Sequence, residues 1–199
     1  MGCTVSTIEN SHYPNTDRNN DTATHIPQMS DEQTNVIQDN WQTLKLHIAN
    51  IGVKTYSSMF ESRPELIKTF SKFKGKDLYT LQESGLLQQH ALRVMATIDK
   101  CITYINQPSS MIQILREVGH LHTVYNVKPD DIQIILPHFL SAMKPYIEGK
   151  WSDDLQDTWI KFLTIVFYHM REGMQEELSP EEVKQQKDHQ QHTAEEKLD

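Results

Sequence analysis

Long apolar runs are absent from the sequence, and cysteine, glycine and proline are scarce. No stretch approaches the roughly 20 apolar residues that a membrane-spanning helix needs, which excludes a transmembrane protein. Two cysteines, Cys3 and Cys101, stand among 199 residues, too few for a disulfide framework or a cysteine-rich zinc site. We therefore expect a reducing, cytosolic setting. The 7 glycines and 8 prolines argue against a turn-rich all-β chain and against a fibrous protein.

A basic region is also lacking. The net charge is −8, and residues 175–199 hold eight acidic and three basic side chains. Residues 1–30 hold three acidic side chains and one arginine, so the central part of the chain is nearly neutral. This distribution offers no surface for phosphate groups, and nucleic acid is not expected as a partner. The acidic end is expected to be a disordered, solubilising tail.

The limits of the folded part follow from composition and from one start signal. Residues 4–29 are rich in Ser, Thr, Asn and Asp and show no helical or strand period, so they are expected to form a linker. Ser30, with Gln33 three residues later, has the pattern of a helix-capping box. We predict a flexible N-terminal segment at 1–29, one domain at 30–178 and the acidic tail at 179–199.

Every periodic segment inside the domain has helical spacing, which predicts an all-α protein. Pro137 should kink the helix that contains it, because its ring displaces a backbone hydrogen bond. Asn126 is expected as a left-handed cap at the end of another helix. The expected helices cover about 31–46, 47–62, 64–70, 78–106, 110–125, 129–147 and 152–177.

Two histidines interrupt the apolar faces of consecutive helices. His90 follows Leu87 by three residues on one face, and His122 shares the next face with Leu115 and Val118. A titratable ring on such a face costs free energy unless it has a partner. One interpretation is that each ring is a satisfied core histidine. The other is that both rings bind a group held between the helices.

The kind of group is restricted by the small number of ligands. Two histidines do not complete a zinc site, and the sequence has neither a His-Glu-x-x-His motif nor a cysteine pair to complete it. Iron in a porphyrin needs only axial ligands from the protein, because the macrocycle supplies four nitrogens. Haem is therefore the metal group that this pair suits.

Several further motifs follow one another in order across about 31–174. They are Trp41, Pro64 with Phe70 and Phe73, the run His90-Ala-Leu-Arg-Val94-Met95, the run from Leu115 to Pro129 that contains His122, and Gly149-Lys-Trp151 with Trp159. Their order and spacing resemble the globin family, which implies a globin fold and a haem b cofactor (iron protoporphyrin IX).

The resemblance implies two iron ligands. His122 corresponds to the proximal ligand and His90 to the distal histidine. His120 is the competitor for the proximal position, but it lies about 200° around the helix from His122 and away from the apolar face. The separation of 32 residues between His90 and His122 is similar to that in the neuroglobin and globin X groups. It implies that His90 binds the iron directly when no other ligand is present.

The resemblance also assigns the pocket walls. Phe70 corresponds to the phenylalanine that stacks on the haem, and Phe73 belongs to the same corner. Val94 corresponds to the apolar residue over the sixth coordination position, and Val127 to a contact on the proximal side. Tyr56 stands where many globins have Leu or Phe. Its phenol either donates a hydrogen bond to a bound ligand or is a core tyrosine bonded elsewhere.

The implied function is binding of O₂ and, by resemblance, of NO and CO, or electron transfer through the iron with a reductase as partner. Nitrite reduction, NO oxidation and protection from peroxides cannot be assigned from these residues. The alternative is a cofactor-free helical adaptor or sensor module at a membrane, in which His90 and His122 only pack.

The N-terminus matches a lipidation motif. Met1-Gly2-Cys3-Thr4-Val5-Ser6 has the M-G-x-x-x-S pattern for N-myristoylation on Gly2, and Cys3 beside it offers a palmitoylation site. The same Gly-Cys start is similar to the globin X group. No apolar stretch of secretory type follows. We expect attachment to the cytoplasmic face of a membrane, the plasma membrane in particular; a chance match would leave a soluble globin.

Overall fold

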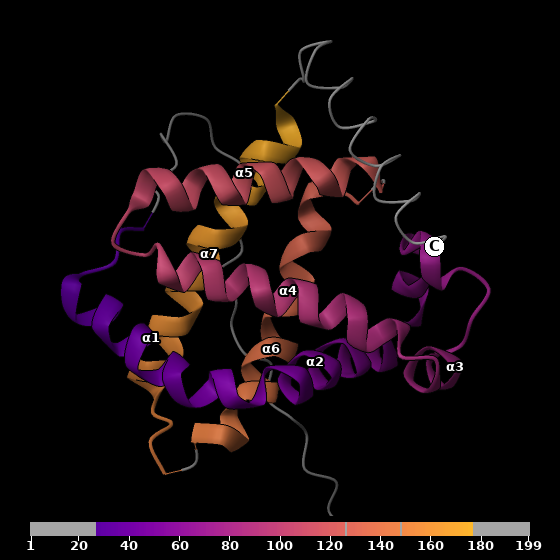
Figure 1. The fold of residues 1–199 in the computed structure, drawn as a ribbon, viewed down its shortest axis with the longest axis horizontal. Coiled ribbons are helices and arrows are strands. Elements are labelled where there is room, and N and C mark those ends of the chain that lie inside the picture. Colours follow the sequence, from indigo (N-terminus) through magenta and orange to yellow (C-terminus); the bar gives the residue numbers. More distant parts are fainter. Residues whose placement is uncertain (1–26, 126, 148, 177–199) are drawn as a thin grey trace, which may run out of the picture.

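The computed structural model describes residues 27–125, 127–147 and 149–176, and every element in these ranges is a helix, which confirms the all-α prediction (Figure 1). Segments 1–29 and 179–199 lie almost wholly outside this part, as does Asn126, so the domain limits and that cap stay predictions. The α-helices are α1 (Asp31–Leu44), α2 (Ile48–Ser62), α3 (Leu78–Glu83), α4 (Leu86–Thr103), α5 (Pro108–Val124), α6 (Leu136–Met143) and α7 (Asp153–Gln175). Short 3₁₀ helices cover Lys45–His47, Pro64–Thr69, Ser71–Phe73, Pro129–Ile135 and Lys144–Ile147.

The first helix begins as the capping pattern predicts. The Ser30 hydroxyl accepts a hydrogen bond from the Gln33 amide at 3.2 Å, and the Gln33 side chain accepts one from the Ser30 amide at 3.1 Å. Farther along α1, the indole of Trp41 donates to Asp99 of α4 at 2.7 Å, and Lys45 pairs with the same carboxylate at 3.0 Å. These contacts tie the start of the domain to its central helix.

The prediction of one long helix at 78–106 is wrong, because the chain divides there into α3 and α4. Gly85 has a φ of +70°, in the left-handed region that ends a right-handed helix and that glycine adopts without a Cβ clash. Leu81 of α3 precedes Leu87 of α4 by six residues, which is not a same-face spacing within one helix. The apolar face that predicted the long helix therefore belongs to α4, and the prediction extended it too far toward the N-terminus.

The prediction of one kinked helix at 129–147 is also wrong. Pro137 lies in the first turn of α6, where an amide hydrogen would have no partner within the helix. The preceding residues form the 3₁₀ helix Pro129–Ile135, and the following ones form Lys144–Ile147. The proline begins a helix instead of bending one.

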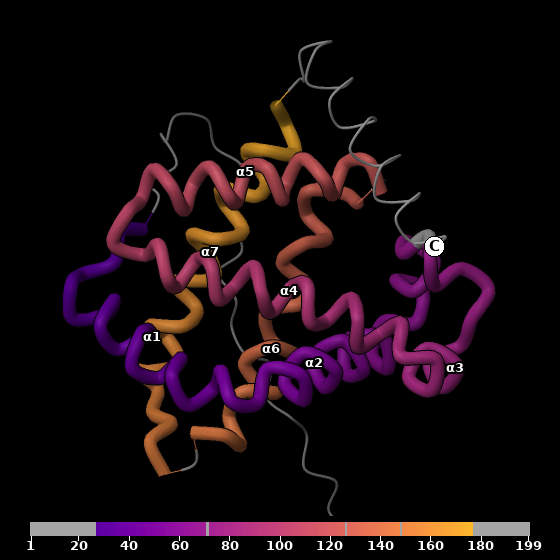
Figure 2. The backbone as a smooth tube through the Cα atoms, viewed as in Figure 1, coloured from indigo at the N-terminus to yellow at the C-terminus, as the bar shows by residue number. Residues whose placement is uncertain are grey.

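Two glycines bring α5 and α7 into backbone contact, and the crossing of these helices can be followed in Figure 2. A Cβ on Gly119 would lie closer than 3.0 Å to the Met170 backbone, and one on Gly173 would lie equally close to the Arg116 backbone. At the α2–α4 contact, a Cβ on Gly52 would lie 3.0 Å from the Ala91 Cβ. The small residues thus set how closely these helices approach.

The buried apolar side chains form two clusters. The larger cluster joins α1, α5, α6, α7 and the second half of α4, and it includes Cys101. The smaller cluster joins α2, α3 and the first half of α4. The members of the smaller cluster are Tyr56, Met59, Phe60, Phe73, Leu81, Leu87 and Ala91.

Among the described residues, no helix has the length and hydropathy required to cross a bilayer.

Replacing Gly119 by Ala should destabilise the protein. The added methyl group meets the Met170 backbone, which cannot rotate away, so we expect a loss of about 3 kcal/mol in the free energy of unfolding. In an open helix the same change would stabilise by roughly 0.5–1 kcal/mol. Urea denaturation of the wild type, Gly119→Ala and Gly52→Ala measures this, and Gly52→Ala should lose less because its neighbours are side chains. If Gly119→Ala is as stable as the wild type, the close contact of Gly119 with the Met170 backbone is contradicted.

Candidate functional site

His90 of α4 lies among aromatic rings. The ring centroids of Tyr56, Phe70 and Phe73 are 4.9, 5.0 and 6.0 Å from that of His90, and each pair is close to perpendicular. Burial, together with the charge of Arg93 and the proximity of His122, lowers the pKa of His90 to about 4. The imidazole is therefore neutral at pH 7, with one ring nitrogen that carries a lone pair.

The hydroxyl group of Tyr56 makes a polar contact with the His90 ring. The Tyr56 hydroxyl lies 3.2 Å from Nε2 of His90, and its own ring packs edge-on against Phe70. Burial raises the pKa of Tyr56 well above its usual value, although Arg93 opposes the shift. The phenol is thus protonated at every physiological pH. The sequence left open whether the phenol bonds to a bound ligand or elsewhere, and in the structure it is hydrogen-bonded to His90.

His122 of α5 has one ring nitrogen committed to its own helix. Nδ1 lies 2.7 Å from the carbonyl oxygen of Val118, and since a carbonyl only accepts, Nδ1 carries the hydrogen. Nε2 is then the ring nitrogen left to donate a lone pair. A hydrogen bond of this kind fixes the tautomer and ring direction of a metal-binding histidine. The backbone of Val127 also donates to the His122 carbonyl at 3.2 Å.

The predicted residues are divided between the two apolar clusters. Phe70 and Val94 pack against the smaller cluster, and Val118 and Val127 pack against the larger one. His122 is close enough to His90 to contribute to the lowering of its pKa. The structure therefore gathers Tyr56, Phe70 and Phe73 around His90 and places Val127 beside His122. Gly2 and Cys3 lie outside the described residues.

His120 is placed differently from His122. Both of its ring nitrogens are buried without a hydrogen-bond partner among the described residues. It directly follows Gly119, the residue in contact with α7. No backbone carbonyl orients its ring, in contrast to His122.

Arg93 is a residue of the site that the sequence analysis did not identify. Its charge lowers the pKa of both His90 and Tyr56, which places the guanidinium within electrostatic reach of the pocket. The signal was present in the sequence, because residues three apart on a helix lie on neighbouring positions of its surface. Arg93 was passed over because it lies beside the apolar face and not on it.

The chemistry of this donor set fits haem. Nowhere in the described ranges do three or more His, Cys, Asp or Glu side chains gather in a way that could hold a bare metal ion. The region offers one oriented imidazole, His122, and a second neutral imidazole, His90, between aromatic and aliphatic walls. A porphyrin needs such walls for its apolar faces and only axial ligands for its iron.

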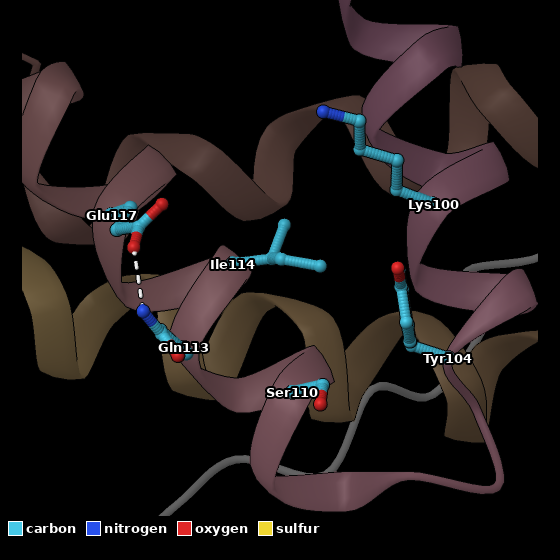
Figure 3. Close-up of a pocket in the computed structure, with 6 residues that line it drawn as sticks. All are labelled: Lys100, Tyr104, Ser110, Gln113, Ile114 and Glu117. Carbon is cyan, nitrogen blue, oxygen red and sulfur yellow. Dashed lines mark hydrogen bonds between the residues drawn. The ribbon is translucent and has the colours of Figure 1, made fainter.

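A groove of about 310 Å³ lies elsewhere, between the end of α4 and the first half of α5 (Figure 3). In this view Ile114 and the Tyr104 hydroxyl point into the space between the helices, and Gln113 donates to Glu117 at 3.1 Å. None of the predicted site residues lines it. Its lining residues are Lys100, Tyr104, Ser110, Gln113, Ile114 and Glu117.

Comparison with known proteins gives a consistent picture. The chain is 26% identical over 144 residues to cytoglobin-2 of Oryzias latipes, which covers 71% of this chain and 80% of the relative. It is 23% identical over 150 residues to neuroglobin of Tetraodon nigroviridis, covering 74% and 94%. The structure of a hexacoordinated haem protein from an anhydrobiotic tardigrade has the same fold. It superimposes with a TM-score of 0.70 at 17% identity, covering 78% of this chain and all of that one.

The family model named Globin matches residues 53–170, which is more than half of the chain and includes both His90 and His122. The match extends from α2 through most of α7, so it spans the elements that form the site. Together with the shared helical fold, this match shows that the chain belongs to the globin family.

Proposed function

We propose that this globin holds haem b through His122 and binds O₂, NO and CO on the side of His90. Bound haem supplies an iron atom that takes up diatomic gases at an open axial position and exchanges electrons between its ferrous and ferric forms. The observation that carries the proposal is the 2.7 Å bond from His122 Nδ1 to the Val118 carbonyl, which leaves Nε2 as the donor atom.

His122 is suited to permanent ligation. Its partner is a carbonyl of the same helix four residues earlier, so the orientation of the ring is set by local structure. A hydrogen bond to Nδ1 also raises the basicity of the opposite nitrogen. The residue therefore presents a fixed, strong donor from the proximal side.

His90 is suited to reversible ligation. With a pKa of about 4 the ring needs no deprotonation before it can donate a lone pair. The rings of Phe70 and Phe73 pack edge-on against it and make its surroundings apolar. We propose that His90 binds the iron when no gas is present and leaves when a gas binds.

We also propose that the protein is attached to the cytoplasmic face of the plasma membrane by myristate on Gly2 and palmitate on Cys3. A single myristoyl chain gives only marginal binding, on the order of 10⁴ M⁻¹, so stable attachment needs a second signal. Residues 1–30 contain one arginine and three acidic side chains and hence no basic patch. Palmitate on Cys3 is the signal that remains. A reductase at the membrane would return the iron to the ferrous form.

Replacing His122 by Ala should remove most of the bound haem, because the proximal side then has no donor for the iron. The measurement is the ratio of Soret to protein absorbance after purification. The control is His120→Ala on the same helix, which should keep its haem. A colourless wild type would favour the cofactor-free adaptor instead. An unaltered spectrum in His122→Ala would show that the ligand is another residue.

Replacing His90 by Leu should convert the unliganded ferrous protein from a six-coordinate low-spin form to a five-coordinate form. CO should then bind faster, because no internal ligand has to leave first. Visible spectra and flash photolysis measure both effects. His138→Leu is the control, since His138 is bonded to Ser58 of α2 at 2.9 Å and is not among the rings around His90. A high-spin wild type would contradict direct ligation by His90.

Gly2→Ala should move the protein from membranes to the cytosol, since it removes the first lipid and the membrane encounter that precedes the second. Cys3→Ser should leave a weakly bound, salt-insensitive pool. Fractionation of cells that express the three forms measures this, and haem spectra should be identical in all of them. Equal distribution of wild type and both variants would mean that the motif is a chance match.

A further inference from the structure

The hydrogen bond between Tyr56 and His90 uses the nitrogen that an iron ligand needs. The Tyr56 hydroxyl lies 3.2 Å from Nε2 of His90, the ring nitrogen farther from the α4 backbone. If Nε2 accepts from the phenol, its lone pair is occupied. If Nε2 instead donates to the phenol oxygen, it carries a hydrogen and has no free lone pair. In either tautomer, Nε2 cannot keep this bond and also bind iron.

The surroundings of the Tyr56 hydroxyl favour its bond to His90. Among the described residues, His90 is the only hydrogen-bond partner of the Tyr56 hydroxyl. The Tyr56 side chain is 6% exposed and packs against Phe60 and Phe70, which have no polar atoms. When His90 turns away, a buried hydroxyl therefore loses its partner, which is unfavourable. The bond thus favours the position of His90 in which it is not an iron ligand.

We propose that Tyr56 competes with the iron for Nε2 of His90 and so determines how much of the protein has an open gas-binding position. Tyr56 is then a positioning residue that acts through His90. This inference rests on the proposed function, because it requires haem bound on His122.

The size of the effect follows from the ordinary strength of such a bond. A hydrogen bond between neutral groups changes an equilibrium by about 3- to 10-fold. Without the phenol, the ratio of six-coordinate to five-coordinate ferrous protein should rise by that factor. Where the six-coordinate form predominates, association of CO at low concentration should slow by the same factor, because less of the protein is open at any moment.

The variant that tests this is Tyr56→Phe, which keeps the ring and its contacts with Phe60 and Phe70 and removes only the hydroxyl. We expect more low-spin ferrous protein and slower CO binding than in the wild type. If the wild type is already fully six-coordinate, the CO rate still reports the change. If it is fully five-coordinate, low-spin protein should appear in the variant. Tyr104→Phe, at the exposed end of α4, makes the same chemical change away from His90 and should have no effect.

A double-mutant cycle separates action through His90 from a direct effect on the gas. In a His90→Leu background, adding Tyr56→Phe should change the CO rate by less than about twofold. Equal slowing in both backgrounds, faster CO binding in Tyr56→Phe, or no change in either measurement would overturn the inference. The proposed function would stand in those cases, provided that the Soret band still depends on His122. A wild-type protein without a Soret band would overturn both the inference and the proposed function.

Discussion

The direct contact between the backbones of α5 and α7 is the constraint on which the site depends. Gly119 and Gly173 have no side chain, and any Cβ at either position would collide with the opposite backbone. His122 and its partner Val118 flank Gly119 on α5, less than one helical turn away. The position of the His122 imidazole relative to α7 is therefore determined by how closely these two helices approach.

The two histidines of the site are held by contacts of different range. His122 is bonded to a carbonyl four residues earlier, so its tautomer follows from the formation of α5 alone. His90 is bonded to Tyr56, 34 residues earlier on α2, so its position requires α2 and α4 to be packed together. That packing passes through the contact of Gly52 with Ala91, the residue after His90. The contact that orients His122 is thus local, and the contact that holds His90 is tertiary.

The sequence was most informative where the physics is local or periodic. The Ser30 cap needs only four residues, and the apolar faces of α4 and α5 identify His90 and His122 as exceptions. The break at Gly85 was missed because the left-handed backbone of one glycine cannot be derived from the spacing of apolar residues. The bond between Tyr56 and His90 could not be derived, since it depends on the separation of two helices. The roles of Tyr56 and His90 toward haem remain predictions that rest on the family and on geometry.

The burial of Cys101 has a consequence for thiol chemistry on this protein. Desolvation raises the pKa of its thiol to about 12, so at pH 7 the side chain is the unreactive thiol. The side chain is also 0% exposed within the larger apolar cluster. Cys3 is the only other cysteine of the chain. Any thiol label on the native protein will therefore be on residue 3, and that residue can take a label only while no acyl group occupies its sulfur.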